Sequence, residues 1–531
     1  MSKLKKIAKE KYLFLLLIVL NALPLFVAPA FITLDGGAHA YNANVIKELI
    51  FNSESVYHNY YEFNPEPVPN WITHILLVAF HFVLPYALAE KLLVFLFFVL
   101  TPYFFRKTIL LLNPDNKAMS YTILPFLHFL MLYLGFFNFT YGILFCFVGI
   151  YYFTLHQRKL NVKSWAILFF IFALTYFSHI FPFIILLMYC MSALFFSYLK
   201  EDGVSLKLLF SKLIKGMLPK LILMVVLVSP FLYLLNNYFA ARPTFNREIF
   251  IEKIDLLRMI YRLKPLQVYS DDELRYTKLM TIWIGIFGLV TIFFLIKNYF
   301  QKKQSFIKDI INHNFIFLSI VLAVLLYVTP DDDGYGGFIS IRITLFIWYF
   351  IVFWMAVQHT NKKLQWIFVA GLISLQIPLL MKRVNGIQWT YSGFTKVKDM
   401  ANYIEPGSKV VQLDFDDANW LGHHLSNYIA TDKPIIVLDN YEATKKYFPL
   451  IWKDDFIPNL KIASVNMFET CNYWKSNPYN PETDQVDYVL LLGERPNEEC
   501  YEKTKLFIAQ NCIPVISCKN VSLYKVKSVN P

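Results

Sequence analysis

The sequence predicts a polytopic α-helical membrane protein that carries a C-terminal α/β domain outside the membrane. Of its 531 residues, 56% are hydrophobic and 18% are aromatic, and the mean hydropathy is +0.44. Soluble domains are nearer half apolar and do not repeat apolar runs of about 18 or more residues. Such runs recur along residues 1–384 and stop there, so we expect a multi-span module followed by a separate domain over residues 385–531.

The membrane module consists of apolar segments joined by loops. Basic flanks stay on the cytoplasmic side of a membrane, and a lysine-rich stretch, residues 3–11, precedes the first segment. The N-terminus is therefore expected inside, and basic connectors near 156–159 and 361–363 place residues 237–277 and the C-terminal domain outside. The segments lie near residues 12–33, 71–88, 91–111, 119–136, 138–155, 164–178, 181–199, 217–236, 278–297, 314–329, 342–358 and 365–381.

An even number of spans would return the C-terminal domain to the cytoplasm. One apolar segment between residues 70 and 160 must therefore be split, merged with its neighbour or only partly inserted. We expect an odd number of spans, about 11 or 13.

Residues 385–531 have a different pattern, with short apolar runs separated by polar stretches. Such runs predict strands, and helices between them predict a compact α/β domain with a central sheet. The expected strands are Val410–Leu413, Pro434–Leu438, Val486–Leu491 and Val521–Tyr524. The expected helical stretches lie near residues 395–404, 442–447 and 498–510.

Charge and cysteine content exclude two kinds of partner. The net charge is +12, but from residue 383 onward there are 16 Lys/Arg against 18 Asp/Glu. The excess belongs to cytoplasmic loops, so no nucleic-acid partner is expected. Of the six cysteines, those of the C-terminal domain allow three pairings in an oxidising compartment, and none has the CxxC spacing of a zinc site. They are Cys471, Cys500, Cys512 and Cys518.

Asp35 is the most informative single residue. It lies just past the first apolar segment, in the stretch Thr33–Tyr41, and is therefore expected at the outer surface of the membrane. A carboxylate near apolar surface has its pKa raised toward neutrality and then suits general-base work on a hydroxyl or amine. Asp is also a favoured N-cap for a helix that begins at Gly36 to Ala38, and both roles stay open.

The first outer loop, residues 34–70, predicts a helix followed by extended chain. An apolar face recurs at helical spacing through Ala38, Tyr41, Val45 and Leu49. This pattern favours an amphipathic helix on the membrane surface, with Gly36 and Gly37 as a flexible start. Prolines at 65, 67 and 69 then favour an extended approach to the next span.

The second outer loop, residues 237–277, carries many cations, which runs against the bias for basic residues inside. Guanidinium groups suit phosphate oxygens, so a lipid phosphate would explain them. Six acidic residues in the same loop favour the alternative of a salt-bridged amphipathic surface. The cations are Arg242, Arg247, Lys253, Arg258, Arg262, Lys264 and Arg275, with Lys278 in the next span.

Arg342 is a further candidate for phosphate, at the start of an apolar segment. A charge at that depth usually faces a cavity or a polar partner, and snorkelling to the headgroups is the alternative.

Asp331–Asp333 lacks the ligand spacing of a calcium loop. His179 is expected at a hairpin tip, and the pair His423–His424 is a weak metal candidate. No residue is therefore predicted as a metal ligand.

Signature motifs exclude several activities. Walker A, GxGxxG, GxSxG and HExxH motifs are all absent from the sequence. This argues against ATP-driven transport within this chain, nicotinamide chemistry, and the commonest hydrolases and zinc proteases.

The layout resembles the GT-C superfamily, whose members are integral-membrane glycosyltransferases that use polyprenyl-phosphate sugars. The likeness rests on the Asp35 motif, the following Tyr41 and the proline-rich approach to the second span. The resemblance implies that Asp35 is the catalytic acidic residue and that Arg342 or the basic loop contacts the donor phosphate. The substrate- or phosphate-binding residues assigned in this way are Tyr41, Glu66, Arg258, Arg262, Lys264, Lys278 and Arg342.

The resemblance also implies a location and partners. These are the bacterial inner (plasma) membrane with a cytoplasmic N-terminus and a periplasmic or extracellular C-terminal domain, a polyprenyl-phosphate-linked sugar donor, membrane lipid, and a glycan, lipid or protein acceptor. No cofactor is indicated, and a divalent metal is allowed rather than required. Two departures stand out, because Asp35 is alone until Glu48 and a second acidic motif is missing, with Glu62 and Glu66 the nearest acids.

Two other functions compete with this one. A transporter or flippase of lipid-linked glycans predicts charges deep within the spans, whereas here the charges gather at span ends. A non-catalytic membrane assembly protein predicts that Asp35 is a simple helix cap.

Overall fold

The computed structural model describes residues 2–157, 159–199, 213–240, 249–302, 314–332, 336–416, 421–453 and 486–527. The chain forms two compact units. The first unit comprises Met1–Pro24, Phe95–Leu132 and Phe139–Val384, and the second comprises Leu25–Val94, Tyr133–Asn138 and Asn385–Pro531. The first outer loop thus folds with the C-terminal region, which begins at the residue where a separate domain was expected.

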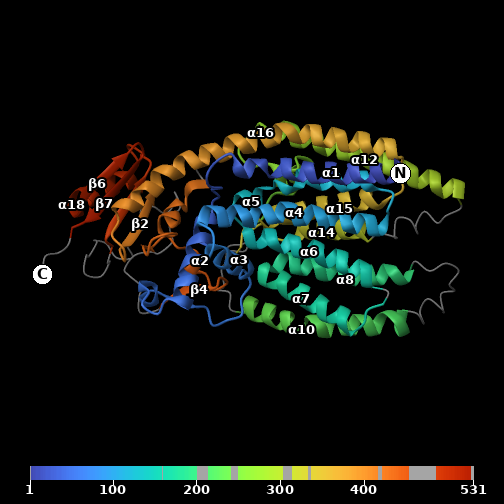
Figure 1. Ribbon diagram of the computed structural model, residues 1–531, viewed down its shortest axis with the longest axis horizontal. Coiled ribbons are helices and arrows are strands. Elements are labelled where there is room, and N and C mark those ends of the chain that lie inside the picture. The colour runs from blue at the N-terminus through green and yellow to red at the C-terminus, as the bar shows by residue number, and fades with distance from the viewer. Residues whose placement is uncertain are drawn as a thin grey trace. The chain divides into compact units, whose positions relative to one another are not determined.

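The first unit is a bundle of helices (Figure 1). The described part of the chain contains 7 helices that are long and apolar enough to cross a membrane, together with shorter apolar helices. The protein is therefore a multi-pass α-helical membrane protein, as predicted. The main helices of this unit are α1 (Ser2–Ala22), α4 (Tyr86–Leu112, which begins in the second unit), α6 (Phe137–His156), α7 (Val162–Ser178), α8 (Ile180–Leu199), α10 (Leu218–Ala240), α11 (Lys253–Tyr261), α12 (Glu273–Lys302), α14 (Phe315–Val328), α15 (Ile339–Val357) and α16 (Lys362–Met400, which ends in the second unit).

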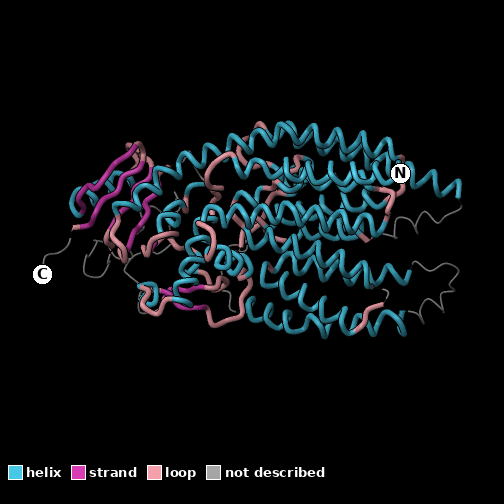
Figure 2. The backbone as a smooth tube through the Cα atoms, in the orientation of Figure 1, coloured by secondary structure: helices cyan, strands magenta, loops and turns pink. Residues whose placement is uncertain are grey.

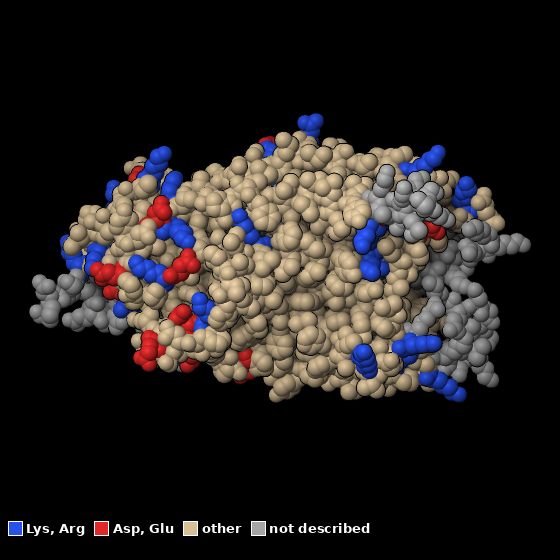
Figure 3. Space-filling view, in the orientation of Figure 1, with Lys and Arg blue, Asp and Glu red and all other residues tan. Residues whose placement is uncertain are grey.

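The surface of the bundle is apolar where lipid is expected. Helices α10 and α12 expose large apolar side chains, including Val226, Leu289 and Phe293, which in water would form an unusually large patch. Figure 3 shows few charged side chains over the middle of the helical bundle, on the face in view. Inside the bundle, α15 is almost wholly buried and packs through aromatic rings such as Phe353 against Phe105.

The predicted segment 71–88 is much shorter in the structure than expected. Here the chain forms α3 (Ile72–His81), whose ten residues reach only about 15 Å, half of the hydrocarbon core. The segment is therefore too short to span, and an odd number of spans stays a prediction. The predicted segment 119–136 is the 3₁₀ helix η3 (Lys117–Leu127) followed by the short helix α5 (Leu130–Tyr133).

The C-terminal part of the second unit contains a five-stranded mixed sheet, shown as strands in Figure 2. Strand β2 (Lys409–Asp414) lies parallel to β3 (Ile436–Val437) and β5 (Tyr488–Leu492). Strand β7 (Val521–Val526) pairs antiparallel with β5 and with β6 (Cys512–Cys518). The central strands β2 and β5 are buried along almost their whole length, as parallel strands require.

The predicted α/β class is confirmed, and three local details differ. Helix α18 (Glu499–Asn511) matches the helix expected near 498–510. Strand β6 was not predicted, the helix expected near 442–447 is only the 3₁₀ turn η9 (Glu442–Thr444), and residues 395–404 complete α16 and the turn η6 (Ala401–Tyr403).

The first outer loop is built into this C-terminal region. Helix α2 (Gly36–Phe51) packs against the 3₁₀ helix η8 (Leu425–Ala430). Strand β1 (Tyr61–Phe63) pairs antiparallel with β4 (Leu450–Trp452). The expectation of a surface helix was wrong, because every residue from Gly36 to Ile46 is buried. Polar residues on the supposed outer face of α2 are covered by the C-terminal chain.

Candidate active site

Asp35 immediately precedes α2, but its side chain is not the helix cap. The Gly36 amide donates to Thr33 Oγ1 at 3.0 Å. The Asp35 carboxylate makes no capping hydrogen bond to the amides of α2, all of which the structure describes. The Asp35 backbone amide donates to the carbonyl of Leu134 at 3.1 Å. The residue is thus held in place by its backbone, and the capping alternative is not realised.

The glycines that flank Asp35 allow close packing rather than flexibility. A Cβ atom at Gly36 would lie 2.3 Å from Glu90 Oε1 and 2.8 Å from the Tyr428 hydroxyl. A Cβ at Gly135, whose φ of +78° also favours glycine, would lie 2.9 Å from the Asp35 amide. The predicted flexible start at Gly36 and Gly37 was therefore wrong, because side chains from two other segments fill the space.

Glu90, near the start of α4, supplies a second buried acid beside the N-terminus of α2. Its carboxylate accepts hydrogen bonds from the Tyr428 hydroxyl at 3.1 and 3.3 Å. The next residue, Lys91, is also buried and donates to the carbonyl of Ala28. Both residues were missed in the sequence because they lie where one predicted apolar segment ends and the next begins. The signal was an adjacent acidic and basic residue near the start of α4.

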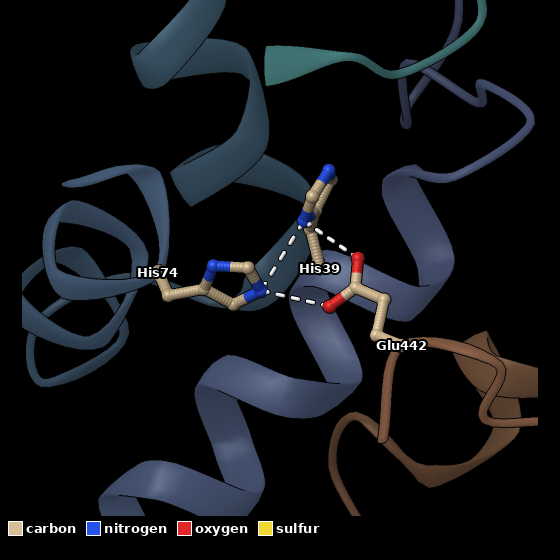
Figure 4. A group of neighbouring side chains, drawn as sticks. All are labelled: His39, His74 and Glu442. Atoms are coloured by element: carbon tan, nitrogen blue, oxygen red, sulfur yellow. Dashed lines mark hydrogen bonds and ion pairs between the residues drawn. The ribbon is translucent and has the colours of Figure 1, made fainter. Parts of the chain in front are cut away.

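A second polar cluster consists of His39, on the helix that follows Asp35, and of His74 and Glu442 on neighbouring segments. His39 is on α2, His74 on α3 and Glu442 at the start of η9, and Figure 4 shows all three turned toward one another. His39 Nδ1 lies 2.9 Å from Glu442 Oε1, and His74 Nε2 lies 2.9 Å from Glu442 Oε2. The two imidazole nitrogens are 3.2 Å apart. All three residues are buried.

Burial and the charged groups around Asp35 together set its pKa near neutral pH. Burial raises the pKa of Asp35 to about 6, although His424, His39 and the Tyr441 hydroxyl favour its charged form. Burial alone would lower the pKa of His424, but the Asp439 carboxylate outweighs this and raises it to about 9. A cationic imidazole therefore faces a carboxyl group that titrates near the pH at which a general base is most effective.

The weaker sequence candidates of the C-terminal region belong to the same polar network. His423 Nδ1 lies 2.7 Å from Asp414 Oδ2, and His424 Nδ1 lies 3.3 Å from Asp439 Oδ2. The two adjacent histidines thus pair with different carboxylates. Among the described residues, the group that converges as metal ligands is instead His39, His74 and Glu442.

Tyr41 and Glu66, both expected to contact substrate, occupy different surroundings. The Tyr41 hydroxyl donates to the carbonyl of Ile435 at 3.0 Å and accepts from the Val437 amide at 3.2 Å. It is fully buried and holds strand β3 against α2, which is a positioning role. Glu66 is exposed in the proline-rich stretch.

The predicted cations of the second outer loop lie in the first unit, where α11 carries some of them. Arg258 is half exposed and pairs with Asp255 at 2.8 Å, as the salt-bridged alternative expects. Arg262, Lys264 and Lys278 are partly buried. Arg242 and Arg247 lie outside the described residues, as do Asp333 and Gly334.

Arg342 also belongs to the first unit, in the first turn of α15. One of its terminal nitrogens lies 3.3 Å from His179 Nε2, and its guanidinium lies 5.4 Å from the centre of the Phe139 ring. His179 lies between α7 and α8, at the hairpin tip as predicted, and beside the Arg342 cation. That Arg342 and Asp35 face a common donor site stays a prediction.

The buried pair of Arg383 and Glu273 was not predicted from the sequence. Arg383 donates to Glu273 Oε1 at 2.6 Å and to the carbonyl of Leu266 at 2.6 Å. Glu273 in turn accepts from the amides of Val268 and Tyr269. The pair holds the end of the second outer loop onto α12 and α16.

The bonding state is known for three of the four C-terminal cysteines. Cys500 is disulfide-bonded, whereas Cys512 and Cys518 are free. Cys471 lies outside the described residues.

No family model and no curated protein matches the chain. Among solved structures, ArnT from Cupriavidus metallidurans in the apo state is similar over 99% of this chain and 98% of its own, with 10% identity and a TM-score of 0.43. The same protein bound to undecaprenyl phosphate is similar over 97% of both chains, with 11% identity and a TM-score of 0.41. Both TM-scores are below 0.5, so the function rests on the residues of this chain.

Proposed function

We propose that this protein is a GT-C-type membrane glycosyltransferase that transfers a sugar from a polyprenyl-phosphate-linked donor to an acceptor on the outer face of the membrane. The observation that carries the proposal is the state of Asp35. Its carboxyl group is buried, its pKa is about 6, and the capping role that would explain it otherwise is filled by Thr33. A buried acid that does not cap its helix and has a pKa near neutrality is characteristic of a catalytic base.

In the proposed reaction, Asp35 takes the proton of an acceptor hydroxyl or amine. The freed oxygen or nitrogen bonds to the anomeric carbon of the donor sugar, and the bond from that carbon to the phosphate oxygen breaks. The polyprenyl phosphate leaves with the electron pair of that bond. His424, held cationic by Asp439, stabilises the ionised form of Asp35 before the transfer.

The negative charge that develops on the leaving phosphate requires cations. We assign this role to Arg342, with Arg262, Lys264 and Lys278 as further contacts. Arg258 is already paired with Asp255, and Tyr41 is already bonded to strand β3, so both contribute less to donor binding. Lys91 is a buried cation of the same unit as Asp35 and is a further candidate.

The outer-face location is supported by the lysine-rich N-terminus and by the disulfide at Cys500. Disulfides persist in oxidising compartments and are rare in the cytoplasm. We therefore place the second unit on the periplasmic or extracellular side of a bacterial inner membrane.

The test compares the wild-type protein with Asp35→Asn, both purified in detergent. Undecaprenyl-phosphate-linked hexoses and pentoses serve as donors, a bacterial envelope extract serves as acceptor, and the release of undecaprenyl phosphate is measured by mass spectrometry. Loss of a general base lowers the rate by about 100-fold or more, so release should fall by at least that factor without loss of folding. Release at the wild-type rate by the variant would overturn the assignment of Asp35, and movement of donor across vesicles without release would identify a flippase.

A further inference from the structure

We propose that His39, His74 and Glu442 bind one divalent transition-metal ion of the Zn²⁺ class. His39 Nδ1, His74 Nε2 and the Glu442 carboxylate oxygens converge from three separate segments and lie within 4.8 Å of one another. Two imidazoles and one carboxylate form a donor set suited to zinc, with a fourth position left for water or substrate. The inference stands independently of the glycosyltransferase activity.

The hydrogen bonds of His74 show why a metal suits this cluster. His74 Nδ1 lies 2.9 Å from the carbonyl of Asn70, and a carbonyl only accepts, so Nδ1 carries the proton. In the neutral ring Nε2 therefore presents a lone pair. That lone pair faces Glu442 Oε2 at 2.9 Å and His39 Nδ1 at 3.2 Å. An ion between these atoms would take the His74 lone pair, His39 Nδ1 and the Glu442 carboxylate as its ligands.

Glu442 provides a second, independent observation. Its Oε2 accepts a hydrogen bond from Asn42 at 2.6 Å. Its Oε1 is buried and lies 2.9 Å from His39 Nδ1, with which it forms an ion pair when that imidazole is protonated. A buried carboxylate requires a cation or hydrogen-bond donors beside it, and here two imidazoles face its two oxygens. A metal ion would satisfy Oε1 and both imidazoles together.

The spacing fits a tetrahedral ion after small shifts. Zinc lies about 2.0–2.1 Å from nitrogen and oxygen ligands, which places tetrahedral ligand atoms about 3.3 Å apart. The three separations here are 3.2, 2.9 and 2.9 Å. Movements of about half an ångström by side chains therefore complete the site.

Neighbouring polar groups orient the ligands as they do in metal sites generally. The Asn70 carbonyl fixes the His74 ring, and Asn42 fixes the Glu442 carboxylate. Asn440 in turn donates to Asn42 Oδ1 at 2.7 Å. The bound ion would join α2, α3 and the C-terminal chain, and would anchor the helix that follows Asp35.

The test uses the full-length protein in detergent, free of any affinity tag. The protein is stripped with a chelator and then incubated with Zn²⁺, and the metal content is measured by mass spectrometry alongside the melting temperature. We expect close to one zinc per chain and a rise in melting temperature of about 5 °C or more. His74→Gln should lose both, whereas the control His58→Gln, whose ring lies outside the cluster and 3.1 Å from the Asn52 carbonyl, should retain both.

Because a ligand variant can fail to fold, a second measurement uses the wild-type protein alone. Co²⁺ added to the stripped protein should produce the visible absorption of tetrahedral nitrogen and oxygen coordination, and Zn²⁺ should abolish it. Wild-type protein that takes up neither ion, or His74→Gln that binds zinc as the wild type does, would overturn the proposal.

Discussion

Each unit contains a buried carboxylate that faces a positively charged or titratable group, and the two sites differ in which groups face the carboxylate. In the first unit, Glu273 accepts from Arg383 and from two backbone amides, so both of its oxygens are used. In the second, the two oxygens of Glu442 face the imidazoles of His39 and His74. A guanidinium and backbone amides can only donate, so the first arrangement is structural. Imidazole nitrogens are also metal ligands, so the second arrangement is suited to bind an ion.

The largest expected loss of stability comes from breaking the complete pair. Arg383→Met leaves the Glu273 carboxylate buried beside an apolar side chain, which costs about 3–5 kcal/mol. The melting temperature in detergent should fall accordingly, while zinc binding by the second unit should persist in the folded fraction.

The double variant Arg383→Met with Glu273→Gln is the control, because it removes the uncompensated charge and should recover part of the loss. A single variant that melts like the wild type would show that this pair is not a brace.

Asp35→Asn should raise stability, in contrast to Arg383→Met, and should do so only above acidic pH. The pKa of Asp35 is about 6 in the folded protein and 3.8 as a free group, so the folded state holds the proton more tightly. Ionisation of Asp35 then destabilises the wild type as pH rises from 4 to 6, by about 3 kcal/mol once complete. The Asn variant lacks this titration, so it should melt above the wild type at pH 7.5 and equally at pH 4.

Melting curves across this pH range check the expectation, with Asp271→Asn as an exposed acid for comparison. Melting temperatures of wild type and Asp35→Asn that change in parallel with pH would show that the pKa of Asp35 is not raised in the folded protein. The contrast between the two units would then be lost.

The smallest effect is expected at the solvent-exposed pair. Arg258 and Asp255 are each about half exposed, and such pairs contribute about 0–1 kcal/mol. Arg258→Ala should leave the melting temperature within a few degrees of the wild type. A marked rise in KM for the lipid-linked donor in the same variant would return Arg258 to the phosphate-binding residues.

Membrane class, most helix positions and the central strands of the C-terminal region followed from the sequence alone. The membrane interior is the stable environment for long apolar runs. Strands β2 and β5 are shorter apolar runs with clear ends, as buried parallel strands are. Asp35 was also found by its position, because few acids lie so close to the end of an apolar segment. These features depend on residues that are neighbours in the chain, which is why pattern alone sufficed.

The tertiary structure alone decided what surrounds Asp35. His74 and Glu442 are 368 residues apart in the chain, and Glu90 and Tyr428 are 338 apart. No local pattern records such pairings, because they depend on the first outer loop folding with the C-terminal region. The same packing converted a supposed surface helix into a buried one, since contacts from distant segments, and not helix periodicity, determine which faces of α2 are covered.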